Sequence, residues 1–91
     1  MAVDVTGNLY VADTGNHLIR KIPIGLGGAV VTTFAGSTVG SANGTGIEAQ
    51  FSSPTGVVAD SSGENLYVAD TGNHRIRKIT TPAGVVSTLA R

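Results

Sequence analysis

A thirteen-residue segment occurs twice in this chain with a single difference, and this repeat limits the possible folds more than any other feature. Residues 9–21 read LYVADTGNHLIRK and residues 66–78 read LYVADTGNHRIRK, so that only Leu18 and Arg75 differ. The offset between the two copies is 57 residues throughout. Two near-identical segments in a chain of 91 residues indicate a repeat architecture, in which each copy forms one unit that stacks on its neighbour.

Each copy contains two β-type runs separated by a polar turn. An apolar run with Tyr and Val precedes the segment Asp-Thr-Gly-Asn-His, and alternating apolar and basic side chains follow it. This pattern predicts a β-hairpin. We expect Gly15 and Gly72 to supply the positive φ that the turn needs. We expect the carboxylates of Asp13 and Asp70 to accept hydrogen bonds from backbone N–H groups of the turn.

Two further apolar runs flank each hairpin, which makes four strands per repeat. In the first repeat the expected strands cover residues 1–5, 9–13, 18–22 and 29–35. In the second repeat they cover residues 56–60, 66–70, 75–79 and 85–90. The short turns between them predict an all-β chain in which each repeat is a four-stranded antiparallel meander.

The connection between the repeats is Gly-rich but carries apolar residues of its own. Residues 47–51 are expected to make one helical turn, with Ile47 and Phe51 anchoring the connection on the sheets. The predicted organisation is a first unit truncated at its N-terminal edge, an inter-unit loop and a second unit, over residues 1–36, 37–55 and 56–91.

Composition argues against several classes of function. Six basic and six acidic residues give zero formal net charge, so excess positive charge cannot attract nucleic acid or anionic membranes. The chain has no Cys, and therefore no disulfide framework, thiolate metal site or Cys nucleophile. We recognise no signal peptide, and no apolar run approaches the roughly 18 residues of a membrane span. We therefore expect a soluble chain, whose compartment the sequence does not assign.

The combination of motifs resembles the NHL repeat, a family named for an Asn-His-Leu tripeptide. Residues 16–18 show that tripeptide literally, and residues 73–75 read Asn-His-Arg. The second repeat also carries P-x-G-V-x-x-D before this motif and GVVSTLA after it. Residues 41–51 are similar to the inter-blade segment of the long bacterial NHL repeats. The resemblance implies a β-propeller with one four-stranded blade per repeat, in agreement with the strand count.

Two blades leave sheet faces uncovered, and the resemblance implies a closed ring. Propellers close with about four to eight blades, and six are common in this family. Bare faces with Val3, Val11 and Ile19, or with their opposite numbers, favour association. Identical chains can continue a ring head to tail, so we expect a homotrimer with six blades. Two chains would give four blades and four chains eight. The high internal identity fits a recent duplication or an engineered chain.

The residues of the predicted turns are the first candidates for a site. They are Asp13, Gly15, Asn16, His17, Asp70, Gly72, Asn73 and His74. A metal or acid–base role of the two His is conceivable because His titrates near neutral pH, but packing or hydrogen bonding within the blade is favoured. The D-x-x-N spacing resembles a calcium loop only superficially, because the later Glu of an EF-hand is missing. Turn capping is therefore the favoured role of Asp and Asn.

Two further sets of charged residues are candidates for binding. Asp4 and Asp60 end the innermost strands of the implied propeller, where a ring of carboxylates at the channel mouth could hold a cation. A structural role in tying adjacent turns is favoured for them. The basic clusters lie on alternating strand positions, so we expect some members to pair with Asp or with Glu48 of a neighbouring blade. The two clusters together consist of Arg20, Lys21, Arg77 and Lys78.

The favoured function is that of a non-enzymatic, self-assembling NHL-type propeller unit, which serves as a structural scaffold or binds a protein or peptide ligand. We predict no catalytic residue, no metal ligand and no cofactor. Two alternatives remain open: a fragment of a propeller enzyme, such as a metal-dependent lyase or hydrolase, and an RNA- or peptide-binding propeller. Repeat-identical residues give symmetry, whereas catalysis usually needs an asymmetric set. Zero net charge and 4% aromatic residues argue against RNA.

Overall fold

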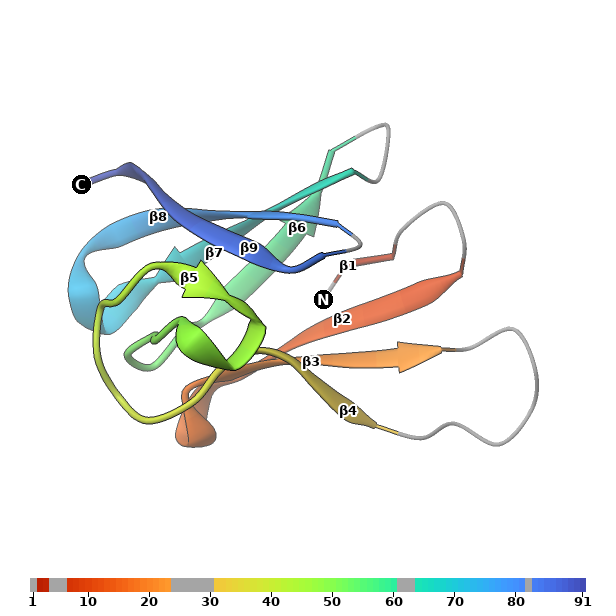
Figure 1. Ribbon diagram of the computed structural model, residues 1–91, viewed down its shortest axis with the longest axis horizontal. Coiled ribbons are helices and arrows are strands. Elements are labelled where there is room, and N and C mark those ends of the chain that lie inside the picture. Colours follow the sequence, from red (N-terminus) through yellow and green to blue (C-terminus); the bar gives the residue numbers. More distant parts are fainter. Residues whose placement is uncertain (1, 4–6, 24–30, 61–63, 82) are drawn as a thin grey trace.

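Two antiparallel sheets account for most of the regular structure (Figure 1). The computed structural model describes residues 2–3, 7–23, 31–60, 64–81 and 83–91. Within these residues the chain is all-β, apart from three one-turn 3-10 helices. These helices are η1 (Thr14–Asn16), η2 (Gly46–Glu48) and η3 (Thr71–Asn73). No helix in the described ranges has the length and apolar character needed to cross a bilayer.

The first sheet is a meander of four strands in the order β1-β2-β3-β4. Its strands are β1 (Ala2–Val3), β2 (Asn8–Asp13), β3 (Leu18–Pro23) and β4 (Thr32–Gly36). The strands expected over residues 1–5 and 29–35 fall partly outside the described residues.

The second sheet has five strands in the order β5-β9-β8-β7-β6. Its strands are β5 (Gly44–Thr45), β6 (Gly56–Ala59), β7 (Asn65–Asp70), β8 (Arg75–Thr80) and β9 (Val85–Ala90). The expectation of four strands is wrong for this sheet, because two residues of the connection pair with the start of β9 and add a fifth strand.

Each hairpin turn ends in a histidine with left-handed backbone. His17 has φ 61° and His74 has φ 54°. Gly15 and Gly72 do not have positive φ, so the expectation for these glycines is wrong. Both glycines lie inside a 3-10 turn of right-handed residues, and the chain reverses its handedness only at the residue that follows the helix.

The connection between the sheets is held by one aromatic side chain. Phe51 is fully buried, as expected, whereas Ile47 is 72% exposed and does not anchor the connection. Residues 46–48 form η2 beside β4, and Ala49, which follows this helix, occupies the buried position instead. The backbone N–H of Thr45 donates to Glu48 Oε1 at 3.2 Å in a capping box, so Glu48 is used within the connection.

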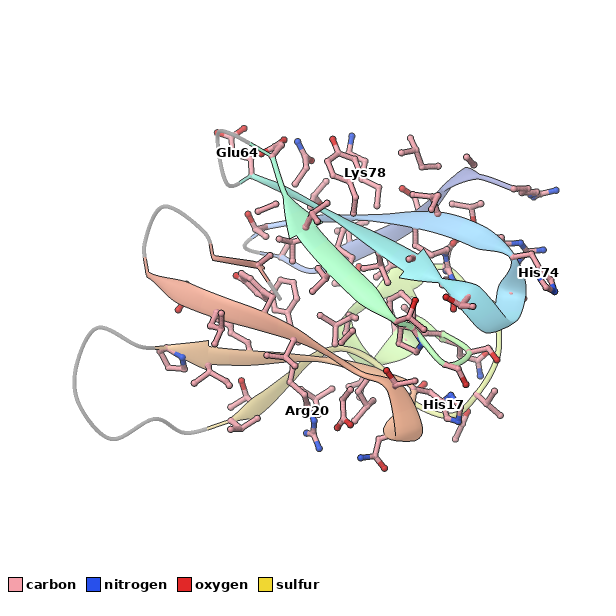
Figure 2. All side chains as sticks on the ribbon, turned by 180° about the vertical axis from the view of Figure 1, so that it is seen from behind. His17, Arg20, Glu64, His74 and Lys78 are labelled. Carbon is pink, nitrogen blue, oxygen red and sulfur yellow. The ribbon has the colours of Figure 1, made fainter. Side chains whose placement is uncertain are left out.

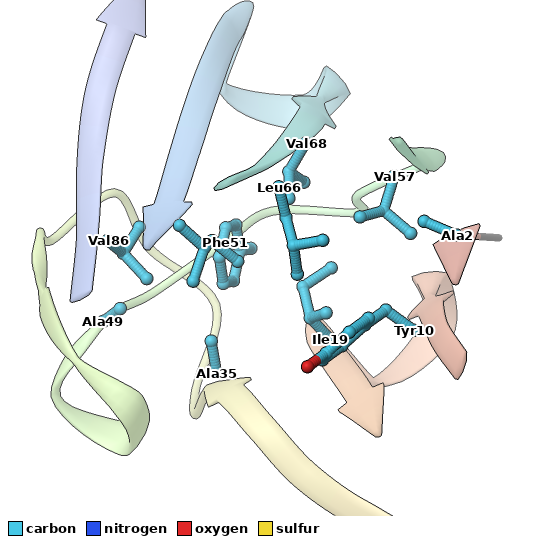
Figure 3. Packing of buried hydrophobic residues seen from close by; sticks show 11 residues of the cluster. Ala2, Tyr10, Ile19, Ala35, Ala49, Phe51, Val57, Leu66, Val68 and Val86 are labelled. Carbon is cyan, nitrogen blue, oxygen red and sulfur yellow. The ribbon is translucent and has the colours of Figure 1, made fainter. Parts of the chain in front are cut away.

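The core lies where the two sheets meet, and β6 contacts both β1 and β2 there. Figure 3 shows Tyr10 and Ile19 of the first sheet facing Val57 and Leu66 of the second. The ring of Tyr10 also meets Phe34 edge to face, at 4.9 Å between centroids. Removal of these side chains from water stabilises the arrangement of the two sheets.

Candidate functional site

Each sheet has two faces, and the strand register shows which residues share a face. In the first sheet, Tyr10 lies opposite Lys21, and in the second, Tyr67 lies opposite Lys78. We call this side the tyrosine face, which consists of Tyr10, Ala12, Ile19 and Lys21 in the first sheet and Tyr67, Ala69, Ile76 and Lys78 in the second. The other side is the aspartate face, which consists of Leu9, Val11, Asp13, Arg20 and Ile22 in the first sheet and Leu66, Val68, Asp70, Arg77 and Ile79 in the second.

The tyrosine face of the first sheet packs on the aspartate face of the second sheet. Ile19 is fully buried, whereas its counterpart Ile76 is 40% exposed. Leu66 is likewise fully buried, whereas its counterpart Leu9 is only partly buried. The aspartate face of the first sheet and the tyrosine face of the second sheet therefore lack the cover that their counterparts have. The expectation for the bare faces named Val11 and Ile19 or their opposite numbers. Val11 does lie on an open face, whereas Ile19 lies on the covered one and its counterpart Ile76 is open.

The open tyrosine face of the second sheet is hollowed and mostly apolar. One hollow of about 390 Å³ is lined by Val58, Tyr67 and Ile76, among others. A second hollow, of about 320 Å³, lies at the turn end of the same sheet and includes His74 and Arg91. Val58 is 61% exposed here, so this face presents large apolar side chains to solvent.

The aspartate face of the second sheet holds a closed polar cluster of Asp70, Asn73 and Arg77. Arg77 Nη1 donates to Asp70 Oδ2 at 2.9 Å, and both side chains are fully buried. Asn73 Nδ2 donates to the same carboxylate oxygen at 2.8 Å. Asp70 Oδ1 accepts the backbone N–H of Ser52 at 2.8 Å. This buried ion pair is therefore matched by hydrogen bonds, as burial of charge requires.

The guanidinium of Arg77 is the centre to which the connection is bound. Its Nη1 also donates to the Gln50 carbonyl oxygen at 2.8 Å. Its Nη2 donates to the Ala42 carbonyl oxygen at 2.9 Å and to Asn43 Oδ1 at 2.8 Å. The group lies over the Phe51 ring at 5.2 Å from the centroid. Only Nε lacks a hydrogen-bond partner among its buried nitrogen atoms.

The equivalent cluster in the first sheet contains the same residue types but is open. Arg20 Nε and Asn16 Nδ2 each donate to Asp13 Oδ2 at 3.0 Å. The side chains of Arg20 and Asp13 are 31% and 29% exposed. Arg20 Nη1 donates to Thr33 Oγ1 at 2.9 Å.

The pKa of Asp13 is lowered, first by the hydrogen bond from Asn16 and then by that from Arg20. Figure 2 shows Arg20 projecting from the outer side of the first sheet.

Sequence reasoning predicted part of these clusters. The prediction that some basic residues pair with Asp is confirmed for Arg20 and Arg77. In both sheets the carboxylate partners within the turn are Asn side chains, whereas backbone N–H groups of the turn were expected. The residues of the connection that bind Arg77 were not predicted. The identical seven-residue spacing from Asp to Arg in both repeats is a signal for the ion pairs alone, and it does not indicate the residues of the connection.

The connection also ties the two hairpin turns together. The backbone N–H of Ser53 donates to His17 Nδ1 at 3.0 Å, so the His17 side chain bonds to the connection, while its backbone N–H donates to the Thr14 carbonyl oxygen within the turn. Thr14 Oγ1 donates to the Pro54 carbonyl oxygen at 2.7 Å. Figure 2 shows His74 projecting at the turn end of the second sheet, and this side chain is exposed. The two turn histidines therefore have different surroundings, although the segments that contain them are nearly identical in sequence.

Of the two aspartates expected at a channel mouth, the structure describes Asp60. Asp60 Oδ2 accepts a hydrogen bond from Asn65 Nδ2 at 2.8 Å, which ties the ends of β6 and β7. Asp4 lies outside the described residues. Among the residues that are described, no three His, Asp or Glu side chains gather where they could hold a metal ion.

Comparison with known proteins gives a consistent result. A family model described as NHL repeat matches residues 1–22 and 51–79, which is more than half of the chain. The chain is 41% identical over 86 residues to NHL repeat-containing protein 2 from Homo sapiens, a match that covers 94% of this chain and 11% of that protein. It is 40% identical over 91 residues to the Gallus gallus protein of the same name, with coverages of 99% and 12%. The chain thus spans about a tenth of the length of these relatives.

Proposed function

This chain belongs to the NHL repeat family, and from that premise we propose that it is a non-enzymatic, self-assembling β-propeller unit. Each of its two sheets is one blade, and the chain is a scaffold whose loops present a binding surface. In this proposal the blades of several chains stack around a common axis, and the chain catalyses no reaction.

The proposal rests on one observation: each sheet buries one face and leaves the other exposed, and the face that is buried in one sheet is the face that is exposed in the other. Inside the chain, the tyrosine face of the first sheet fits the aspartate face of the second, and Ile19 becomes fully buried in that contact. The two faces left open are of the same two kinds. The second sheet of one chain can therefore pack on the first sheet of another chain through the contact that already joins the two sheets.

Such a contact is head to tail, so repeated copies either close a ring or grow without end. A closed ring satisfies every open face, which favours closure. Three chains would supply six blades, a number within the range in which propellers close. We therefore propose a homotrimer. Burial of apolar area, at about 25 cal/mol per Å², is the driving force, and Val58 and Ile76 are its most exposed contributors.

A scaffold role fits the chemistry of the described residues. The polar cluster of the second sheet binds backbone carbonyl and amide groups of the connection, which is how a surface recognises a peptide chain. We propose that any external ligand is a protein or peptide held by the loops at one end of the ring. Zero net charge argues against nucleic acid as the ligand.

The experiment that tests this proposal places a charge on the open tyrosine face. Ile76→Asp adds a carboxylate to a residue that is already 40% exposed, so the single chain still folds. We expect its mass in solution, by size-exclusion chromatography with light scattering, to fall from about three chains to one, since a buried unpaired charge is costly. Circular dichroism checks that the variant keeps its β structure.

Ile47→Asp is the matched control, because Ile47 is 72% exposed on η2 and lies outside both open faces. This variant should keep the mass of the unaltered chain. If Ile76→Asp and Ile47→Asp both keep that mass, the tyrosine face is not an assembly surface and the proposal fails.

A further inference from the structure

The Asp13-Asn16-Arg20 cluster of the first sheet has the same composition as a site that is occupied elsewhere in the chain. In the second sheet the equivalent residues bind residues 40–53 of the connection. These contacts bury Asp70 and Arg77 completely. In the first sheet no described segment takes that place, and the ion pair stays about 30% exposed. The described part of the chain thus shows one site with its peptide segment and one equivalent site that none of its segments fills.

The contacts made by the ligand segment define the chemistry that fits. Two backbone carbonyl groups and the side-chain carbonyl of Asn43 accept hydrogen bonds from the guanidinium. The backbone N–H of Ser52 donates to the carboxylate oxygen that faces away from the arginine. The ring of Phe51 packs against the guanidinium plane. The segment folds back on itself through η2, and the Gln50 N–H donates to the Ala42 carbonyl oxygen at 2.9 Å. A short peptide loop of this shape, with Asn near one end and Phe-Ser near the other, supplies all of these groups.

The free groups of the first-sheet cluster match this list. Arg20 Nη2 makes no hydrogen bond to the described residues, and neither does Asp13 Oδ1, so the two N–H groups of Nη2 and one carboxylate oxygen can bond to a docked segment. In the occupied cluster the arginine contacts the aspartate through Nη1, whereas Arg20 uses Nε. Docking would therefore turn the Arg20 guanidinium so that Nη1 and Nη2 face the incoming carbonyl groups.

The first sheet also has room for the peptide backbone. Gly72 of the occupied site lies against Ser52, whose carbonyl oxygen accepts the Gly72 N–H at 2.8 Å. A Cβ atom on Gly72 would lie 2.6 Å from that oxygen. A Cβ atom on Gly15, the equivalent residue, would meet nothing within 4 Å. No described residue therefore fills, beside Gly15, the space that Ser52 fills in the second sheet.

We propose that the Asp13-Asn16-Arg20 cluster is a docking site for the inter-repeat segment of another NHL repeat, with the chemistry of residues 40–53 of this chain. This inference rests on the proposed function, because it takes the occupant from a further blade of the same family. It adds to that function a specific peptide-binding surface, which the contact between sheet faces alone does not fill. Each chain offers one such site.

A synthetic peptide with the sequence of residues 37–55 is the probe. Isothermal titration and chemical-shift mapping with the labelled full chain measure its binding. We expect saturable binding of one peptide per chain, with the largest shifts at Gly15 and at the Arg20 side chain. The peptide should not displace the chain's own connection, because that segment is covalently held at a high effective concentration.

Two variants separate the docking site from other surfaces. Gly15→Ala leaves the free chain intact, since its Cβ atom enters open space at a residue without positive φ, but it occupies the place that the docked Ser needs. Arg20→Ala removes the guanidinium. Each should weaken binding at least about tenfold, which corresponds to about 1.4 kcal/mol. A peptide with Ala in place of Phe51 should bind more weakly to the unaltered chain.

Glu64→Ala is the control, because it truncates an exposed charged side chain that belongs to neither face and lies far from Arg20 (Figure 2). It should bind the peptide as the unaltered chain does. The proposal is overturned if the unaltered chain does not bind the peptide, or if Gly15→Ala and Arg20→Ala bind it equally well. If the chain is a monomer in solution but binds the peptide specifically, the ring is refuted and the docking site is not. If the chain is a trimer that does not bind the peptide, the docking site is refuted and the ring is not.

Discussion

The carbonyl oxygen of Ser52 lies in the place that a side chain on residue 72 would need. An ideal Cβ atom on Gly72 would come within 2.6 Å of this oxygen, and the Gly72 N–H donates to it at 2.8 Å. Only glycine permits so close an approach of two backbone segments. The contact joins the connection to η3 and explains why the turn contains glycine even though its φ is not positive.

Gly72→Ala and Gly15→Ala should therefore have effects of opposite sign. Gly72→Ala forces the connection away from η3, and overpacking of this kind lowers the free energy of unfolding by about 1–3 kcal/mol. The new methyl group of Gly15→Ala meets no described residue, and the substitution reduces the freedom of the unfolded chain, which raises the free energy of unfolding by up to about 1 kcal/mol. Chemical denaturation measures both, and equal losses would contradict the difference between the two turns.

Replacement of the two equivalent arginines by lysine should affect stability unequally. Arg77→Lys keeps the charge, but a single ammonium group cannot reach Asp70 and three acceptors of the connection together, so we expect a loss of about 2–3 kcal/mol. Arg20→Lys alters an exposed pair and should cause a much smaller loss. Thermal unfolding of both variants in dilute solution checks this. Similar midpoints would show that the connection does not depend on Arg77.

The two turn histidines provide a third matched pair. Both have left-handed backbone, so replacement by Ala costs about the same backbone strain at each position. Only His17 accepts a hydrogen bond from the connection, at 3.0 Å from the Ser53 nitrogen. His17→Ala should therefore be less stable than His74→Ala by about 0.5–1.5 kcal/mol. Parallel denaturant titrations give this difference, and a zero or reversed difference would show that the Ser53 contact does not stabilise the fold.

The contribution of the Asp13 cluster to the free energy of unfolding should decrease at low pH. The folded chain lowers the pKa of Asp13 below its ordinary value of 3.8, first through Asn16 and then through Arg20. A carboxyl group with a lowered folded pKa stabilises the fold fully above its unfolded pKa, and this stabilisation is lost as pH falls through the folded pKa. Asp13→Asn should therefore be the less stable protein above about pH 4, and its difference from the unaltered chain should shrink in more acidic solution. Thermal midpoints measured from pH 6 downward check this, and a difference that does not change with pH would contradict it.

The repeat predicted most of the fold because strand patterning is local. The hairpins appear where the LYVAD segments end and the IRK segments begin, and β1–β4 and β6–β9 each form an antiparallel meander. The fifth strand of the second sheet was not predictable, since Gly44 and Thr45 have no strand-like pattern and are ordered by pairing with β9. The exposure of Ile47 likewise depends on how η2 lies beside β4, which no local signal reveals.

The site was less predictable for a different reason. Asp13 and Asp70 stand in identical local sequences, so no sequence pattern distinguishes the open cluster from the closed one. The difference comes from residues 40–53, which fold back on the second sheet from about 30 positions away. Backbone carbonyl groups make most of these contacts, and every residue type carries one. The chemistry of the occupied cluster could therefore only be read once the chain was folded.

The solution mass of the unaltered chain tests the proposed ring most directly. Size-exclusion chromatography with light scattering, repeated over a range of concentrations, gives this mass without any substitution. The ring predicts one species at about three times the 9.1 kDa of the single chain, with no larger species as the concentration rises. A mass of one chain at every concentration would mean that the two open faces do not bind each other, and would contradict the ring.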